Sequence, residues 1–438
     1  MDKEEQPLLD GPSQREGLHE RSRTGHLRDA LRFAAAGFVH FAVWLLLIGY
    51  VKYTWLSSSS DQLPGNCGLR RHTLLSESFP LETGSHRDVA VIQSIEPKHD
   101  HDHGHFHGHH LHVRGRVDVR DGPEARIALD IAANDKDIPF DVSFDDNQKL
   151  NITTPPVLTW HEPYEPCLDV DVVVYLPKDS RLNLLYLHAL TLDILLDSGL
   201  GLGLGHADLG TVSGDVRVRD GSLAEGTVGL TSVSGCVEAE VPVSEVIHVE
   251  TTSGDISLKL VPVPDPPFSR SSLSVSSVSG KTNVTAKDMP TDVSYEDNVK
   301  TVSSDINLML PFSSAAVRSS SGDITASLTP ILAEGGFLKT KSLSGDVEVT
   351  VNEPADGRRL DSLTSHHDST SGDQTIQYPA SWEGKFRASA FSGHVSVKGK
   401  GVKVGGVRRG VKGGKGDGES RLKAKSFSGD IEVVIGEE

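Results

Sequence analysis

The sequence predicts an all-β protein: a parallel β-helix, or solenoid, of about ten irregular coils, preceded by one amino-terminal transmembrane helix and a disordered stalk. Three observations lead to this prediction. A Ser-Gly-Asp unit recurs through the carboxyl-terminal half, polar and aliphatic residues alternate after each unit, and one long apolar stretch lies near the amino terminus. The 438 residues are enough for several separate parts.

Residues 1–32 are predicted to be a disordered cytosolic tail. The tail contains Glu4-Glu5-Gln6-Pro7-Leu8-Leu9, which is similar to the acidic dileucine signal that clathrin-adaptor complexes bind. In that interpretation Glu4, Leu8 and Leu9 are the sorting residues. The alternative is that the two leucines belong to a tail that no adaptor recognises.

Residues 33–52 are predicted to form a transmembrane helix. Only His40 interrupts the apolar run from Phe33 to Val51. At ~1.5 Å per residue the run spans about 28 Å, close to the hydrocarbon thickness of a bilayer. Basic residues are frequent before the run, whereas Lys52 alone follows it closely. This asymmetry places the amino terminus in the cytosol and predicts a type II signal anchor.

Residues 53–112 are predicted to be a flexible stalk with a histidine-rich tract. Neutral imidazoles are common metal ligands, and histidines one residue apart can chelate a metal weakly. Two interpretations stay open, a polar linker or a weak metal-binding segment. The candidate ligands are His101, His103, His105, His107 and His109.

Residues 113–200 are predicted to be an irregular β region that caps the first coil, since terminal repeats are usually atypical. Cys67 and Cys167 either pair in an oxidising lumen or stay unpaired, because the chain has an odd count of three cysteines. The sequons that begin at Asn151 and Asn283 predict glycosylation on the lumenal side.

Residues 201–438 carry the repeat. Glycine permits a tight corner, and Ser and Asp side chains cap nearby backbone groups. The alternation after each corner, as in 255–260, predicts a strand with one buried face. Units of this length bury an apolar face only when they stack, which favours a solenoid over a sandwich of hairpins. The serines of the Ser-Gly corners are Ser213, Ser234, Ser253, Ser279, Ser321, Ser344, Ser371, Ser392 and Ser428.

These units, with the lead-in strand Val172–Pro177, resemble the putative-adhesin family of β-solenoid proteins. The resemblance covers roughly residues 165–438 and implies surface binding, but no ligand-binding residues. The anchor, the tail and the sequons indicate a fungal membrane-bound member. Cys236, Lys281 and His394 stand where Asp is usual in the unit, and Ser304 replaces a glycine.

Two further segments invite a functional interpretation. The row of corner aspartates, Asp215 to Asp430, could coordinate Ca²⁺, but turn capping explains these residues without a metal. Residues 396–425 contain ten Lys or Arg and nine Gly, which predicts a basic flexible loop. That loop either contacts anionic groups or is a solvated insertion.

Composition excludes several classes of protein. A net charge of −18 argues against a general nucleic-acid binder, and three cysteines exclude a disulfide-rich scaffold or a Cys-based zinc finger. No hydrolase elbow, metalloprotease motif or phosphate loop occurs, and no cofactor is predicted.

We therefore expect a non-enzymatic, single-pass membrane protein that displays an adhesin-like ectodomain for surface adhesion or structural interaction. Its expected partners are the lipid bilayer, a cell-wall or surface glycan or protein, and an adaptor complex at the tail. The first alternative is a lumenal scaffold of the vacuole or endosome, sorted by the dileucine signal. The second is a carbohydrate-active β-helix enzyme.

Overall fold

The structure is a computed structural model that describes residues 72–96, 109–158, 160, 165–219, 226–331, 335–354 and 357–436. The chain divides into two compact units, Met1–Gly65 and Asn66–Glu438. The predicted tail, transmembrane helix and sorting residues Glu4, Leu8 and Leu9 lie outside the described residues. Every regular element of the described ranges is a strand, so they contain no helix able to cross a bilayer.

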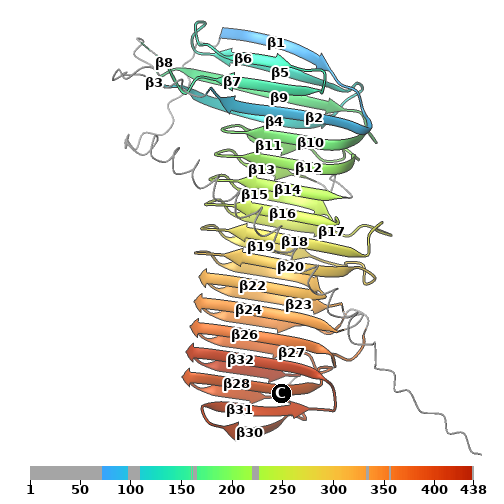
Figure 1. Ribbon diagram of the computed structural model, residues 1–438, viewed down its shortest axis with the longest axis vertical. Coiled ribbons are helices and arrows are strands. Elements are labelled where there is room, and N and C mark those ends of the chain that lie inside the picture. Colours follow the sequence, from blue (N-terminus) through green and yellow to red (C-terminus); the bar gives the residue numbers. More distant parts are fainter. Residues whose placement is uncertain are drawn as a thin grey trace, which may run out of the picture. The chain divides into compact units, whose positions relative to one another are not determined.

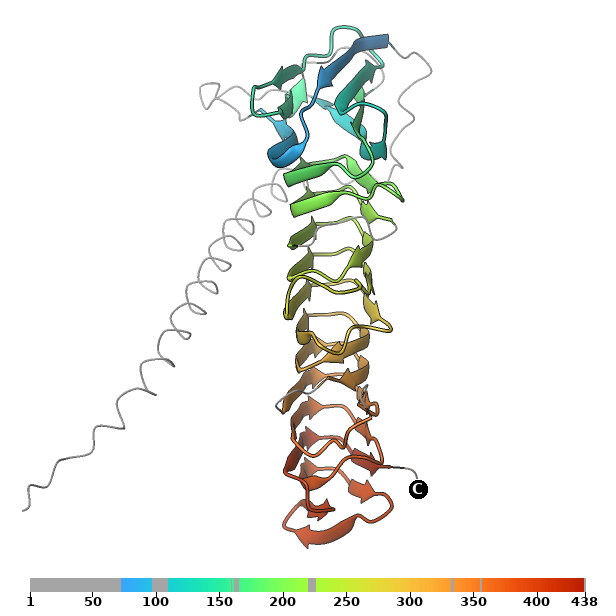
Figure 2. The ribbon, with the colours of Figure 1, turned by 90° about the vertical axis from the view of Figure 1, so that its right-hand side faces the viewer.

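Two long sheets form the second unit (Figures 1 and 2). The 15-stranded sheet contains β1 (His72–Pro80), β4 (His112–Asp121), β5 (Arg126–Ala133), β9 (Cys167–Leu176), β11 (Asp193–Leu196), β13 (Val216–Val218), β15 (Val237–Pro242), β17 (Ile256–Val261), β19 (Thr282–Ala286), β21 (Ile306–Phe312), β23 (Ile324–Pro330), β25 (Val347–Val351), β27 (Gln374–Tyr378), β29 (Val395–Lys398) and β33 (Ile431–Ile435).

The 16-stranded sheet contains β2 (Gly84–Ile95), β6 (Asp141–Phe144), β7 (Lys149–Thr154), β10 (Arg181–Ala189), β12 (Gly203–Thr211), β14 (Thr227–Ser232), β16 (Val246–Thr251), β18 (Arg270–Ser277), β20 (Ser294–Thr301), β22 (Ser314–Ser321), β24 (Gly336–Ser344), β26 (Leu363–Ser371), β28 (Gly384–Ser392), β30 (Lys403–Val407), β31 (Gly410–Lys415) and β32 (Ser420–Ser428). A separate pair joins β3 (His109–His110) to β8 (Val157–Leu158).

Each coil contributes one strand to each sheet, and equivalent strands of successive coils pair in parallel, as β14–β16 and β15–β17 do. Parallel pairing between successive coils confirms the predicted solenoid and rules out a sandwich of hairpins. Eleven coils follow one another, from β10/β11 through β28/β29 and then β32/β33.

The predicted alternation decides which side chains form the core. In β17, Ile256, Leu258 and Leu260 are buried between the sheets, whereas Ser257 and Lys259 are exposed. Because side chains in a strand alternate between its two faces, inward rows of aliphatic residues run from coil to coil. One such row joins Leu258, Val284 and Leu308.

The amino-terminal end corrects two predicted boundaries. Residues 53–112 were expected to be a stalk, but β1 and β2 lie within them, and β2 pairs in parallel with β10 and β7. Val89 and Val91 are buried there, so a short apolar run gains a sheet to pack on. The first coil, β10/β11, precedes residue 201, so the solenoid begins earlier than expected. Antiparallel β1, β5 and β9 end the 15-stranded sheet.

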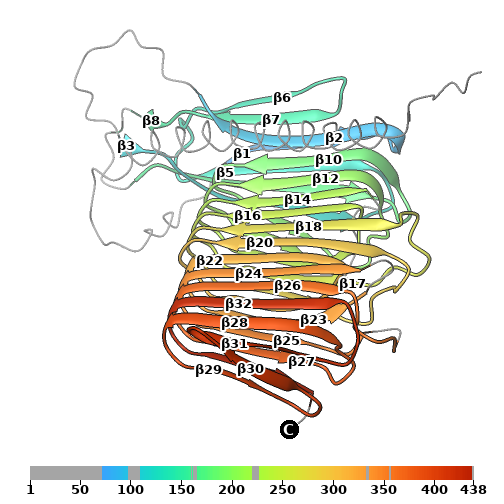
Figure 3. The ribbon, with the colours of Figure 1, turned by 60° about the horizontal axis from the view of Figure 1, so that its bottom comes forward.

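The carboxyl-terminal end departs from chain order. Strands β32 and β33 lie between the coils β26/β27 and β28/β29, so the last coil in sequence is not the last in space (Figure 3). The segment expected to be a basic flexible loop is instead a hairpin of β30 and β31, and β31 pairs antiparallel with β28. The hairpin covers the edge of β28 with a Gly- and Lys-rich strand, which protects the stack from edge-to-edge association.

Candidate functional site

The corner aspartates form a hydrogen-bonded ladder along the stack. The Oδ1 atom of Asp346 accepts the backbone N–H of Asp373 at 2.8 Å, and Asp373 in turn accepts the N–H of Asp430 at 2.8 Å. The carboxylate of one coil therefore caps the backbone of the next. The acceptors in the ladder are Asp193, Asp215, Asp255, Asp305, Asp323, Asp346, Asp373 and Asp430.

The ladder explains the departures from the repeat. His394 donates its backbone N–H to Asp430 at 2.6 Å and lies in the coil that is last in space. No further coil lies beyond it that would need a carboxylate. Cys236 and Lys281 offer no such acceptor, and the ladder is interrupted at those two coils. These hydrogen bonds support backbone capping as the role of these aspartates.

Glycine at the corners is required by close approach between coils. A Cβ atom on Gly235 would lie 1.9 Å from the carbonyl oxygen of Gly214, and one on Gly254 would lie 1.8 Å from that of Gly235. A positive φ is not the general reason, since it occurs at Gly345 but not at Gly235. Four of the corner serines donate to carbonyls of the preceding coil, as Ser213 does to Leu190 at 3.1 Å; the others are Ser234, Ser253 and Ser279.

A second row of hydroxyls lies inside the corners and was missed in the sequence. The Oγ of Ser232 accepts the N–H of Gly235 at 2.9 Å and donates to the carbonyl of Gly214 at 3.2 Å. The signal was a Ser or Thr two residues before the corner serines, with Ala390 before Ser392 as the exception. The buried members of the row are Thr211, Ser232, Thr251, Ser277, Thr301, Ser319, Ser342, Ser369 and Ser426.

Replacing one ladder aspartate tests the capping role. We expect Asp373→Ala to lower the free energy of unfolding by about 1–2 kcal/mol, because the N–H of Asp430 loses a charged acceptor. Urea unfolding measures the change, with Asp146→Ala at an exposed turn as the control. Millimolar Ca²⁺ should leave the unfolding midpoint of the wild type unchanged; a rise abolished by Asp373→Ala would instead favour a calcium site.

The outer face of the 16-stranded sheet carries a dense group of positive charges near its carboxyl-terminal end, over the strands that Figure 3 shows side by side. We call this group the basic face. It comprises Lys300, Arg318, Lys339, Lys341, Lys385, Arg387, Lys412, Arg421, Lys423 and Lys425.

Strand register aligns these residues in rows. One row passes from Lys300 through Arg318, Lys341 and Asp368 to Lys425. Neighbouring strands lie about 4.8 Å apart, so the charges are closely spaced. None of the ten basic side chains forms an ion pair with a carboxylate among the described residues.

The adjacent row includes Lys339, His366, Lys423, Arg387 and Lys412. Within these two rows Asp368 is the carboxylate, and the remaining charged side chains are basic. The rows are therefore positively charged, although the whole chain has a net charge of −18.

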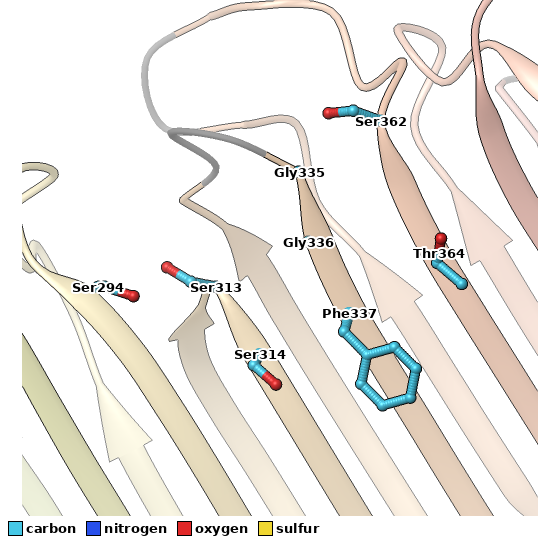
Figure 4. Close-up of a pocket in the computed structure, with 8 residues that line it drawn as sticks. All are labelled: Ser294, Ser313, Ser314, Gly335, Gly336, Phe337, Ser362 and Thr364. Atoms are coloured by element: carbon cyan, nitrogen blue, oxygen red, sulfur yellow. The ribbon is translucent and has the colours of Figure 1, made fainter. Parts of the chain in front are cut away.

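A shallow pocket of about 470 Å³ adjoins the basic face, where the strands begin (Figure 4). Hydroxyl groups dominate its lining, and the ring of Phe337 forms one side. Phe337 is 37% exposed and lies edge-to-face against His366 of the basic rows, with ring centroids 6.0 Å apart. The lining residues are Ser294, Ser313, Ser314, Gly335, Gly336, Phe337, Ser362 and Thr364.

The family model described as Toastrack DUF4097 matches residues 112–434. The chain belongs to this family. The match covers the solenoid and most of its amino-terminal cap, so the corner ladder and the basic face both lie in the Toastrack region. A fungal origin stays a prediction.

Two solved structures resemble the chain. A putative cell adhesion protein from Clostridium sporogenes is 8% identical, with a TM-score of 0.17, over 82% of this chain and 99% of that one. A putative adhesin from Bacteroides fragilis is 10% identical, with a TM-score of 0.22, over 84% of this chain and 98% of that one. Both scores are too low to add to the family assignment. No curated protein matches the chain.

The Toastrack core contains a buried polar network that sequence reasoning also missed. The imidazole of His367 is fully buried, with Nδ1 2.8 Å from Oγ1 of Thr340 and Nε2 3.0 Å from the hydroxyl of Tyr378. Burial lowers the pKa of His367 to about 3 and raises the pKa of Tyr378. Because the network has no contact with solvent, it supports packing of the core rather than chemistry on a substrate.

Asp297 occupies an inward row between Leu273 and Ala315. Burial, and then the charge of Glu296, raises its pKa well above the usual range. Its Oδ2 atom has no hydrogen-bond partner. A carboxyl group in this position is destabilising once it ionises.

Removing this carboxyl should stabilise the protein in a pH-dependent way. The folded state holds a proton that the unfolded state releases above about pH 4, so stability falls as pH rises from there towards the folded pKa. We expect Asp297→Asn to add about 1–3 kcal/mol at pH 8 and little at pH 3.5. Urea titrations at the two pH values measure this; an equal gain at both would show that ionisation is not the cause.

None of the other predicted site residues belongs to the basic face. Of the five histidine ligands, His109 belongs to β3, and the other four lie outside the described residues. The described residues hold no group of three or more His, Cys, Asp or Glu placed to bind a metal. The side chain of Asn283 is exposed on β19, and that of Asn151 is half-buried on β7.

The cysteine prediction is tested in part. Cys167 is disulfide-bonded and buried, whereas Cys236 is free and exposed. Cys67 lies outside the described residues.

Proposed function

We propose that the protein is a non-enzymatic, adhesin-like binding protein, anchored by residues 33–52 as a type II membrane protein. The basic face is the observation that carries this proposal. The 16-stranded sheet holds ten exposed or half-buried basic side chains in register, and none of them forms an ion pair with a carboxylate of the described residues. Unpaired charges at such spacing repel one another and so favour an external partner of opposite charge.

The shallow, open character of the pocket supports binding without catalysis. Among the described residues, no titratable side chain lines it. The buried His367 and Asp297 lie among the inward-facing residues of the core, away from any substrate. General acid–base chemistry requires a titratable group within hydrogen-bond reach of a substrate.

A localisation experiment tests the proposal. We would tag the carboxyl terminus and measure surface signal on intact cells for the wild type and for Leu8→Ala/Leu9→Ala. Surface signal in both supports an adhesin on the cell surface. Vacuolar or endosomal signal that moves to the surface in the double variant would instead favour a lumenal scaffold. A tag accessible only from the cytosol would overturn the membrane topology.

A hydrolysis screen tests the non-enzymatic part. We expect the purified protein to release no reducing sugar from cell-wall polysaccharides over a buffer blank. Release that a Phe337→Ala variant abolished would establish a carbohydrate-active enzyme.

A further inference from the structure

We infer that the basic face and the adjoining pocket together bind an acidic polysaccharide. The inference rests on the proposed function in one respect, since it takes the solenoid to be displayed outside the cytosol. It names the partner class that an adhesin of this kind would bind.

Charge complementarity indicates a polyanion. Cations of the basic face lie on β22, β24, β32 and β28, whereas β26, between β24 and β32, contributes His366 and Asp368. The cations are therefore spaced by one or two coil spacings of about 4.8 Å, and one such spacing is comparable to the length of one sugar unit. A linear polymer with regularly placed carboxylate or sulfate groups can meet several of these cations at once. A single small anion would neutralise only a few of the charges.

The pocket indicates that the polyanion is a saccharide. Serine and threonine hydroxyls both donate and accept hydrogen bonds, which suits the hydroxyl groups of a sugar. The exposed ring of Phe337 offers an apolar surface to the C–H face of a sugar ring. Thr364 of the pocket pairs directly with Arg421 of the basic face, so one bound chain can contact both surfaces.

Nucleic acid and lipid fit these surfaces less well. Single-stranded nucleic acid needs several free aromatic faces for stacking. Among the described residues, the other exposed phenylalanine rings are Phe391 and Phe427. They stack on each other with centroids 4.9 Å apart, and Arg409 covers Phe391 at 4.1 Å. A planar bilayer surface would contact the cations but would leave the hydroxyl-lined pocket empty.

The test measures binding of the full-length protein in detergent micelles to immobilised dextran sulfate, polygalacturonate and neutral dextran. We expect binding to the two acidic polymers, weakening as ionic strength rises, and none to neutral dextran. The face variant carries Lys339→Gln, Lys341→Gln, Lys423→Gln and Lys425→Gln. Its Kd should rise about tenfold, because four exposed ionic contacts with the polymer are lost.

A matched control removes the same number of charges elsewhere. It carries Lys136→Gln, Lys178→Gln, Lys281→Gln and Lys287→Gln, all at exposed sites away from the basic face. We expect its Kd to stay within about twofold of the wild type. Circular dichroism melting of both variants confirms that they are folded.

Several outcomes would overturn the inference. They are equal loss of binding in both variants, equal binding to neutral dextran, or no binding to either acidic polymer. Phe337→Ala should weaken polygalacturonate binding several-fold at high salt, and an unchanged Kd would remove the pocket from the site. Because purified protein is used, failure here leaves the surface-location result of the proposed function untouched, and the reverse also holds.

Discussion

Gly235→Ala should destabilise the protein by about 3 kcal/mol or more. The added methyl group would lie 1.9 Å from the carbonyl oxygen of Gly214, an atom of the rigid backbone that cannot rotate away. The clash is removed only if the two coils move apart. That movement lengthens the hydrogen bond from the backbone N–H of Cys236 to the carboxylate of Asp215 at the same corner. The backbone angle φ of Gly235 is not in the left-handed region, so the clash alone is tested.

Gly229→Ala is the matched control for this prediction. Gly229 belongs to the same coil, but a Cβ there would meet no atom closer than 3.4 Å. Alanine restricts the unfolded chain more than glycine does, so we expect this variant to be as stable as the wild type or up to about 1 kcal/mol more stable. Urea unfolding compares the two variants, and hydrogen exchange locates the weakened coils. Equal stability would show that the corners tolerate a side chain.

Stability should fall with acid between pH 6.5 and 3 because His367 is buried as a neutral imidazole. Its pKa is about 3 in the folded state against 6.5 in its usual environment. Between these values the unfolded chain binds a proton that the folded chain does not. The free energy of unfolding therefore decreases by up to about 1.4 kcal/mol per pH unit as pH falls, and by roughly 4–5 kcal/mol over the window. Above pH 6.5 the neutral imidazole of His367 makes its full contribution to the free energy of unfolding.

His367→Gln isolates this effect, since glutamine stays polar but does not titrate in this range. Asp297 acts with the opposite sign above about pH 4, so both proteins should be compared in an Asp297→Asn background. The slope of unfolding free energy against pH reports how many protons the chain takes up on unfolding. We expect this number to be smaller by up to one in the His367→Gln variant. An unchanged slope would assign the acid sensitivity to other groups.

Much of the fold could be predicted because the repeat encodes it locally. The Ser-Gly-Asp corners and the alternation of 255–260 specify a turn followed by a half-buried strand, and stacking is the way to bury many such faces. The inner hydroxyls, such as Ser232, follow a pattern that is equally visible in the sequence: a Ser or Thr two residues before every corner serine except Ser392. Reasoning centred on the three-residue unit overlooked it.

Other features were not predictable from local patterns. Strand β2 lacks a corner unit and is stabilised by pairing with β10, which lies about one hundred residues later in the chain. The segment 396–425 reads as a loop because glycine and lysine disfavour strands in isolation. The edge of β28 supplies the hydrogen bonds that order it as β31.

The sequence by itself determined the solenoid class, the place of each corner and the alternating core, because these depend on neighbouring residues. The tertiary structure alone decided the order of the last two coils and therefore why His394 needs no carboxylate. It also decided the basic face, since Lys300 and Lys425 belong to one row only after the coils stack. Parallel pairing places residues that are distant in the sequence on neighbouring strands, which lie about 4.8 Å apart, and sequence spacing does not reveal this proximity.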